Sequence, residues 1–161
     1  MAEAQLQVGW NDLTLAVNAW KTLASVKAGA DTVARLLRAK LGCSGISGDA
    51  EPLRFRLQRI TADSGTGTAT TPGRLTQTNK AAARASCRTN FTAEPTAVAV
   101  SAPTHLTAEL LQDMFHPQGG TWEELNLLRT EVEGAAEVAL QVFVPSGGTA
   151  VKCSGHLIYG E

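Results

Sequence analysis

The three histidines are the side chains best suited to holding a metal ion or moving a proton near neutral pH. His105, His116 and His156 are too far apart for an HxH or HxxxH pattern, so the sequence predicts no metal site built on them. The neighbouring carboxylates Glu123 and Glu124 would point to opposite faces of a strand. Solvated charges are therefore a better interpretation of this pair than an acid–base pair.

No nucleophile stands in a sequence context that would activate it. The serines form no GxSxG elbow, and Cys87 lacks the flanking pattern of a catalytic cysteine. The stretch 65–73, GTGTATTPG, is rich in glycine and hydroxyl groups but lacks the Gly-Lys-Ser/Thr ending of a phosphate-binding loop. We therefore expect no catalytic residue, no metal ligand and no cofactor, and we predict that the protein is not an enzyme.

The cysteines are few and widely spaced. Cys43, Cys87 and Cys153 form no CxxC pair, which argues against a disulfide framework and against a zinc site. Cys153 alternates with the apolar residues Val151 and Leu157, so we expect it to be a small core residue.

Composition fits one soluble domain. A chain of 161 residues can bury a sizeable core without a disulfide or metal. The net charge of -1, with both signs spread along the chain, leaves no electrostatic footprint for nucleic acid. Neither a membrane-spanning apolar run nor a signal peptide is apparent, so we expect synthesis in a cytoplasm and no membrane partner. Only 18% of residues are charged, which suits a protein that works within an assembly.

The clearest element is a strand from Glu51 to Thr61, because apolar and polar residues alternate through it. Its apolar face carries Leu53, Phe55 and Leu57, and its polar face carries Arg54, Arg56 and Gln58. The following residues, 62–76, are mostly small and predict a long exposed loop.

The N-terminal segments are short and extended, with a bend at 10–12. Residues 1–12 are assigned as an N-terminal arm and 13–161 as the folded domain. Residues 20–26 alternate as a strand. Residues 31–42 have the apolar spacing of a helix, yet the surrounding segments are extended and we assign a strand.

The C-terminal half is also extended. Residues 106–128 contain helix-like spacing and leave strand or helix open. Residues 137–144 and 151–159 alternate clearly around a turn at 145–148, which predicts a long antiparallel hairpin. Together these segments predict a mainly β chain, an antiparallel β-sandwich or jelly-roll-like single domain with room for one short helix.

Arginine and tryptophan are the residues most able to form an interface. Arg54 and Arg56 share one strand face, with Arg59 beyond them. A solvated face with local salt bridges is the first interpretation, and a subunit contact the second. The scattered tryptophans fit core or interface anchors better than a sugar-binding platform.

The stretch GDAEPLRFRLQRITADSGTGTATTPGRL, together with TNFTAEPTAV and the ending VALQVFVPSGGTAVKCSGHLIYGE, resembles a group of small virion proteins of tailed bacteriophages. The group shows a Gly-Asp turn, an alternating apolar and arginine strand, a Gly/Ser/Thr loop closing on Thr-Pro, and a last strand ending on glutamate. The matching positions here are Gly48-Asp49, Leu53 to Ile60, Ser64 to Thr70, Thr71-Pro72 and Leu157 to Glu161.

This resemblance implies a β-sandwich protein of the phage head. The leading expectation is a decoration (cement) protein on the capsid surface of the virion, with the major capsid protein and further copies of itself, as trimer or dimer, as partners. A neck, tail or head-fibre component is the alternative, and a carbohydrate-binding module is less favoured. The expected interface residues are Leu6, Val8, Trp10, Arg54, Arg56, Arg59, Thr66, Thr68 and Thr71. Truncation of residues 1–9 is expected to weaken capsid binding and leave the fold intact.

Overall fold

The computed structural model describes residues 4–44, 51–75, 83–98, 109–115, 121–124, 130–145 and 151–161. These residues form twelve β-strands and no helix. The strands are β1 (Gln5–Leu15), β2 (Trp20–Lys27), β3 (Val33–Ser44), β4 (Leu53–Ile60), β5 (Thr66–Thr70), β6 (Gly73–Arg74), β7 (Ser86–Ala93), β8 (Glu109–Phe115), β9 (Thr121–Glu124), β10 (Thr130–Glu133), β11 (Glu137–Phe143) and β12 (Val151–Gly160).

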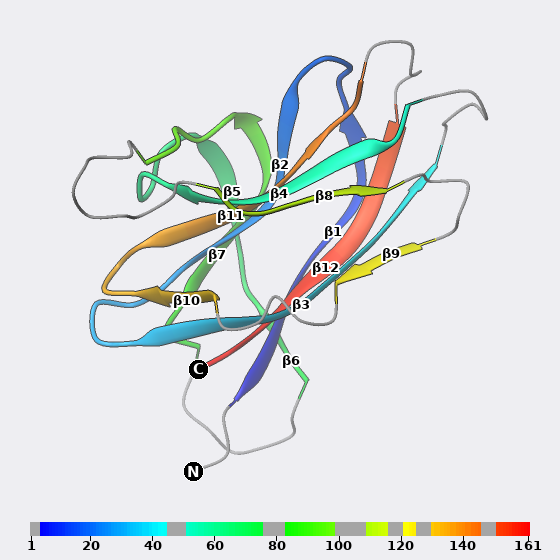
Figure 1. Cartoon of the computed structure of the whole chain (residues 1–161). Coiled ribbons are helices and arrows are strands. Elements are labelled where there is room, and N and C mark those ends of the chain that lie inside the picture. The colour runs from blue at the N-terminus through cyan, green and yellow to red at the C-terminus, as the bar shows by residue number, and fades with distance from the viewer. Residues whose placement is uncertain are drawn as a thin grey trace.

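The strands form two antiparallel sheets that pack as a sandwich, which confirms the predicted fold class (Figure 1). The first sheet has the order β10-β3-β12-β1-β6, and β9 also pairs with β3. The second sheet has the order β5-β7-β2-β11-β4-β8. Apolar side chains from both sheets form one buried cluster between them, which is the core.

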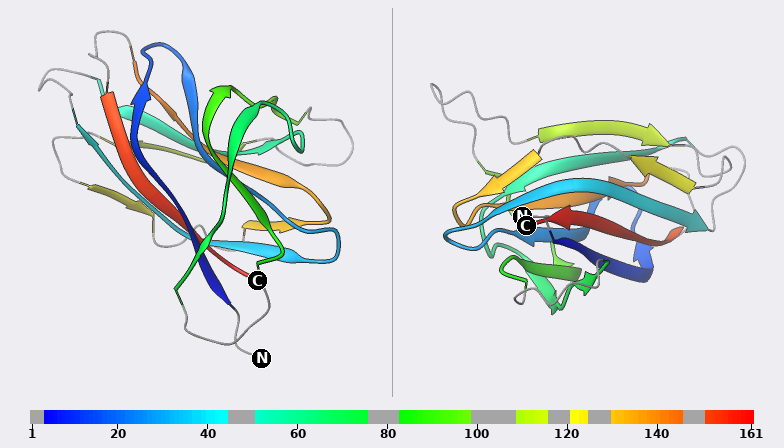
Figure 2. Two further views of the ribbon diagram at one scale, coloured as in Figure 1. Left: turned by 180° about the vertical axis from the view of Figure 1, so that it is seen from behind. Right: turned by 90° about the horizontal axis from the view of Figure 1, so that it is seen from below.

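β12 lies at the centre of the first sheet, between β1 and β3 (Figure 1). Its inward positions Val151, Cys153, Leu157 and Tyr159 are all fully buried. The residue after it, Glu161, exchanges backbone hydrogen bonds with Ala4, with N···O distances of 3.0 and 3.1 Å. Ala4 and Glu161 therefore lie side by side, and both views of Figure 2 show β1 running beside β12.

The strand assigned to residues 31–42 is confirmed as β3, and a bulge in β3 accounts for part of the helix-like spacing. A bulge opposite Ile158 and Tyr159 interrupts the register between β3 and β12. Leu36 and Ala39 therefore both face the core although they are three residues apart. A single extra residue in a strand produces the three-residue spacing that is typical of a helix.

The bend predicted at residues 10–12 is a second bulge, between Trp10 and Leu13 of β1. Asp12 has a φ of 49° there, and its backbone N–H donates a hydrogen bond to Ser154 Oγ at 2.9 Å. The bend does not separate an arm from the domain. The structure places residues 5–12 within β1, where residues 5–10 pair with β12 ahead of the bulge, so the sandwich begins at residue 5 instead of residue 13.

The predicted hairpin between residues 137–144 and 151–159 is wrong, although both strands exist. β11 pairs with β2 and β4 in the second sheet, whereas β12 pairs with β1 and β3 in the first. The chain therefore crosses from one sheet to the other between them. Alternation identifies a strand with one buried face, but two strands on opposite sides of one core show the same alternation.

The exposed loop predicted for residues 62–76 contains two short strands instead. β5 pairs with β7, and β6 pairs with β1. Gly67 of β5 lies on the ring of Phe91, where an added Cβ would come within 2.8 Å of ring atoms. The small residues that suggest a loop thus allow an edge strand to lie close against an aromatic ring.

The helix allowed for in residues 106–128 does not occur in the parts of that stretch that the structure describes, which are β8 and β9. The remainder of the stretch, the Gly48-Asp49 turn and most of the turn after Pro145 lie outside the described residues.

Candidate functional site

Four side chains from three strands meet on the outer surface of the second sheet. The guanidinium carbon of Arg56 lies 3.9 Å from the ring centroid of Trp20, and that of Arg54 lies 5.8 Å from the ring of Phe143. The two rings contact each other, with centroids 5.5 Å apart. We call Trp20, Arg54, Arg56 and Phe143 the arginine–aromatic face. β4, β11 and β2 are neighbours in the sheet, which brings these side chains together.

A chain of hydrogen bonds that runs through Gln141 and Thr22 to Glu94 holds the Arg56 side chain in place. Arg56 Nε donates to Gln141 Oε1 at 2.7 Å, and Gln141 Nε2 donates to Thr22 Oγ1 at 2.9 Å. The Thr22 hydroxyl and backbone N–H both donate to Glu94 Oε2, at 2.5 and 2.7 Å. Gln141 and Thr22 are buried, so the chain is held in a region of low dielectric constant, where hydrogen bonds are strong.

The Glu94 carboxylate at the end of this chain also forms an ion pair with Lys21, at 3.3 Å. A fixed guanidinium stacked on a ring loses little entropy when a carboxylate binds to it. On the arginine–aromatic face, Arg56 is therefore oriented before any partner arrives, and the exposed Arg54 lies beside it.

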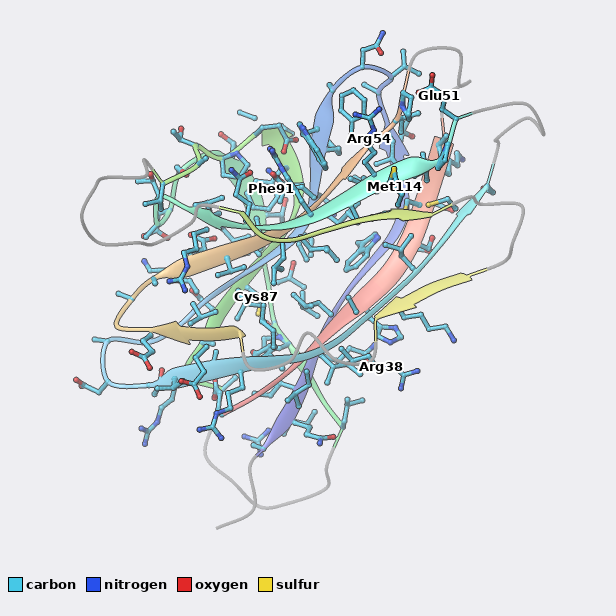
Figure 3. The ribbon with its side chains drawn as sticks, viewed as in Figure 1. Arg38, Glu51, Arg54, Cys87, Phe91 and Met114 are labelled. Atoms are coloured by element: carbon cyan, nitrogen blue, oxygen red, sulfur yellow. The ribbon has the colours of Figure 1, made fainter. Side chains whose placement is uncertain are left out.

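Apolar side chains extend the arginine–aromatic face at its edge. Met114 of β8 is the register partner of Arg54, so the two project from the same side of the sheet, and Figure 3 shows them close together. Met114 is 63% exposed. Arginine, tryptophan, phenylalanine and methionine are the residues enriched in the buried centres of protein interfaces. The surface thus has the chemistry of a protein-binding patch.

A second polar cluster surrounds Glu137, whose side chain has no exposed surface. Its Oε1 accepts hydrogen bonds from Ser25 Oγ at 2.6 Å and from Arg88 Nη2 at 2.6 Å and Nε at 3.1 Å. Its Oε2 accepts from the backbone N–H of Asp63 at 2.8 Å. Arg88 also donates to the backbone carbonyl of Ser64 at 3.1 Å.

This carboxylate is thus occupied on both oxygens and closed to solvent. It ties the turn after β4 onto the outer surface of the second sheet, and it has no access to a substrate. We interpret the Glu137 cluster as a structural clamp.

His156 lies on the outer surface of the first sheet, with Gly9 and Lys40 as its register partners. Partial burial disfavours the imidazolium form, and the nearby cations Arg38 and Lys40 add repulsion, so the pKa of His156 lies below its usual value. His105 and His116 lie outside the described residues. Among the residues that the structure describes, no three His, Cys, Asp or Glu side chains cluster as metal ligands would.

The structure separates the predicted interface residues into three groups. Leu6, Val8 and Trp10 are core residues, with exposed fractions of 1%, 1% and 5%, so they do not offer the partner contact expected of them. They are buried because β1 joins the first sheet with these three side chains turned inward.

The polar residues of the prediction lie apart from one another. Arg54 is exposed and Arg56 half-buried, both on the arginine–aromatic face, whereas the half-buried Arg59 is the register partner of Val138. Thr66 and Thr68 are exposed on β5, at the edge of the sheet opposite to β8, and Thr71 is exposed just after β5. Of the predicted polar residues, Arg54 and Arg56 are therefore the two that meet on the arginine–aromatic face.

Phe143, Met114 and Glu94 are members of this surface that sequence reasoning missed. Phe143 offered a signal, because it is a large aromatic out of phase with the inward residues Val142 and Val144. The sequence around Glu94 gave no such signal, because its hydrogen-bond partner Thr22 is 72 residues away in the chain.

A shallow hollow of about 620 Å³ lies beside β5 and β6. Small and apolar residues make up most of its lining, with Arg74 as the charged member. Among the described residues that line it, the thiol of Cys87 is buried, and no acid or base stands beside a nucleophile. The hollow thus offers contact area without catalytic groups.

Within the described segments, no helix is long and apolar enough to cross a membrane. Comparisons with protein-family models, with curated proteins and with solved structures find no significant match to this chain.

Proposed function

We propose that this protein is a structural component of a tailed-phage virion that binds the outside of the capsid shell and stabilises it. The observation that carries the proposal is the arginine–aromatic face, a fixed patch of the residue types that anchor protein interfaces. The resemblance over the β4 region and the last strand suggests the class of partner, the major capsid protein.

The sandwich suits such a role in three ways. Its outer sheet surface is held in place at two points, because Gln141 accepts a hydrogen bond from the stacked Arg56 and Glu137 fixes the turn after β4. The patch carries positive charge, so a carboxylate-bearing surface is its complement. On a repeating lattice, copies that associate as dimers or trimers gain affinity from simultaneous contacts, so each single contact needs only modest strength.

The first experiment measures the copy number of the protein in purified virions, by quantitative mass spectrometry against the major capsid protein. A ratio near one, or near one third, is expected for a protein that decorates the shell lattice. A few to a dozen copies would contradict the capsid proposal and favour a neck, tail or head-fibre component. Absence from virions would exclude every virion role.

The second experiment tests the arginine–aromatic face directly. Arg56→Lys keeps the positive charge but loses the planar group that stacks on Trp20 and bonds Gln141. Loss of one such stacked contact should weaken binding to shells that lack the protein by roughly tenfold. Lys152→Ala is the matched control, because Lys152 is an exposed cation on the other sheet. Equal binding by both variants would rule out the arginine–aromatic face as the contact.

A further inference from the structure

Cys43 and Cys153 face each other across the first sheet. They are register partners on β3 and β12, and their Sγ atoms lie 3.0 Å apart although 110 residues separate them in the chain. A disulfide needs an S–S distance of about 2.05 Å, so closure by about 1 Å would join them. Directly opposite residues of an antiparallel pair already have the Cβ separation that such a bond requires, to within about 1 Å.

We propose that Cys43 and Cys153 form a cross-strand disulfide when the folded protein meets a small-molecule disulfide such as oxidised glutathione. The widely spaced cysteines argued against any disulfide framework, because sequence spacing carries no information about which strands become neighbours. The pairing of β3 with β12 supplies that information.

The exposure of the two thiols sets the order of the reaction. Cys43 is half-buried and Cys153 has no exposed surface, so the deprotonated Cys43 sulfur attacks one sulfur of glutathione disulfide and one glutathione thiolate leaves. The Cys153 sulfur then attacks Cys43 Sγ in the mixed disulfide, and the second glutathione leaves. Two protein thiols are oxidised, one glutathione disulfide is reduced, and the two protons pass to the two leaving thiolates.

The reaction should be slow at neutral pH and faster in alkali. The hydrogen bond to Cys153 and burial both raise the pKa of the Cys43 thiol well above its usual value, so little thiolate is present at pH 7. Below that pKa each unit of pH increases the thiolate fraction tenfold, and the rate should follow it.

Cys87 is a control that the chain itself provides. It lies on β7 of the second sheet, and its thiol donates a hydrogen bond to Tyr159 Oη at 3.5 Å inside the core. Burial raises the pKa of Cys87 to about 11. What keeps Cys87 reduced is its place in the core: it is 2% exposed, and its sulfur faces a hydroxyl group instead of a second sulfur, so it should stay reduced while the other two thiols pair.

The bond would act as a stabilising link. It would close a loop of 110 residues and so restrict the unfolded chain. The inference is independent of the proposed function, since it concerns the isolated chain. If the protein does belong to a virion, the bond would form after the particle leaves the reducing cytoplasm.

The test uses the purified full chain, incubated while folded with oxidised glutathione at pH 8.5. We expect the intact mass to fall by two hydrogens, the thiol count in denaturant to fall from three to one, and peptide mapping to link Cys43 with Cys153. The midpoint of thermal unfolding should rise by roughly 5–15 °C and return on reduction. Cys87→Ser should behave in the same way, whereas Cys43→Ser should keep both remaining thiols.

Three results would overturn the proposal: three free thiols after incubation, a linkage that contains Cys87, or a glutathione adduct that persists on Cys43. All three results are measured on the wild-type protein, so they do not depend on whether either cysteine variant folds.

Discussion

The Glu137 carboxylate is buried, so the loss of its hydrogen-bond and ion-pair partners would strongly destabilise the fold. Glu137→Gln keeps the shape of the side chain but removes the charge that faces Arg88 in a region closed to solvent. Breaking a buried ion pair from one side costs about 3–5 kcal/mol. We expect urea denaturation to show a loss of about that size in the free energy of unfolding.

Glu131→Gln is the matched control for this change. Glu131 pairs with Arg35 at 2.9 Å, but both side chains are exposed, and an exposed pair contributes less than about 1 kcal/mol. Equal losses in the two variants would show that burial does not set the contribution of Glu137.

His156 should make stability depend on pH in a definite direction. Its folded pKa lies below the unfolded value of about 6.5, so the folded state favours the neutral imidazole. The stabilisation is complete above pH 6.5 and is lost as the pH falls below it, because the unfolded chain then takes up the proton first. His156→Gln should remove this component.

Urea denaturation at pH 7.5 and pH 5.5 checks the sign. The wild-type protein should lose more unfolding free energy between the two pH values than His156→Gln does. The acidic groups titrate in both proteins, so the difference isolates the histidine. An equal loss in both would contradict the lowered pKa.

Among the elements, the pairing of β12 with its neighbours depends on Gly155. A Cβ at this position would lie 2.3 Å from the backbone oxygen of Lys40 and 2.8 Å from the ring of Trp10. Contacts that short with backbone require β3 and β12 to separate, so Gly155→Ala should lower the unfolding free energy by several kcal/mol, or prevent folding.

Gly9→Ala is the control within the same sheet. Gly9 is the register partner of His156, and a Cβ there would meet its nearest atom, the Gly155 oxygen, at 3.5 Å, an ordinary contact. Thermal unfolding should show a shift of a few degrees at most. A larger effect at Gly9 than at Gly155 would contradict the geometry.

Sequence reasoning located most strands, because one buried face imposes alternation on each of them. β4 shows this most clearly, whereas β3 was assigned from its extended neighbours, because its own apolar spacing is typical of a helix. The same reasoning failed where partners had to be chosen: it joined β11 to β12, which lie in different sheets. Alternation records which side chains face the core, and pairing depends on residues far away in the chain.

The candidate site was predictable to a similar extent. The alternation in β4 predicted that Arg54 and Arg56 share one strand face. Their aromatic partners come from β2 and β11, more than thirty residues away on either side, and only the sheet order brings them together. Leu6 and Val8 were misplaced for a related reason, since an apolar segment near the N-terminus suits an arm and a paired strand equally well.

For the whole molecule, β1 is a structural necessity. Removing residues 1–9 deletes Leu6 and Val8 from the core and leaves residues 156–160 of β12 without a partner on that edge. We expect this truncation to unfold the protein, contrary to the sequence-based expectation of an intact fold. Circular dichroism and size-exclusion chromatography check the result, and an unfolding temperature equal to that of the full chain would contradict it.

The central position of β12 also decides when this protein can fold during translation. β1 leaves the ribosome well before its partner β12, because hydrogen-bonded residues such as Asp12 and Ser154 are 142 residues apart in the chain. At a synthesis rate of about 5–20 residues per second, the apolar side chains of β1 wait on the order of 10 s for β12. The first sheet therefore cannot be completed before β12 has been synthesised, and during that interval the unpaired β1 needs protection from aggregation, for example by chaperones.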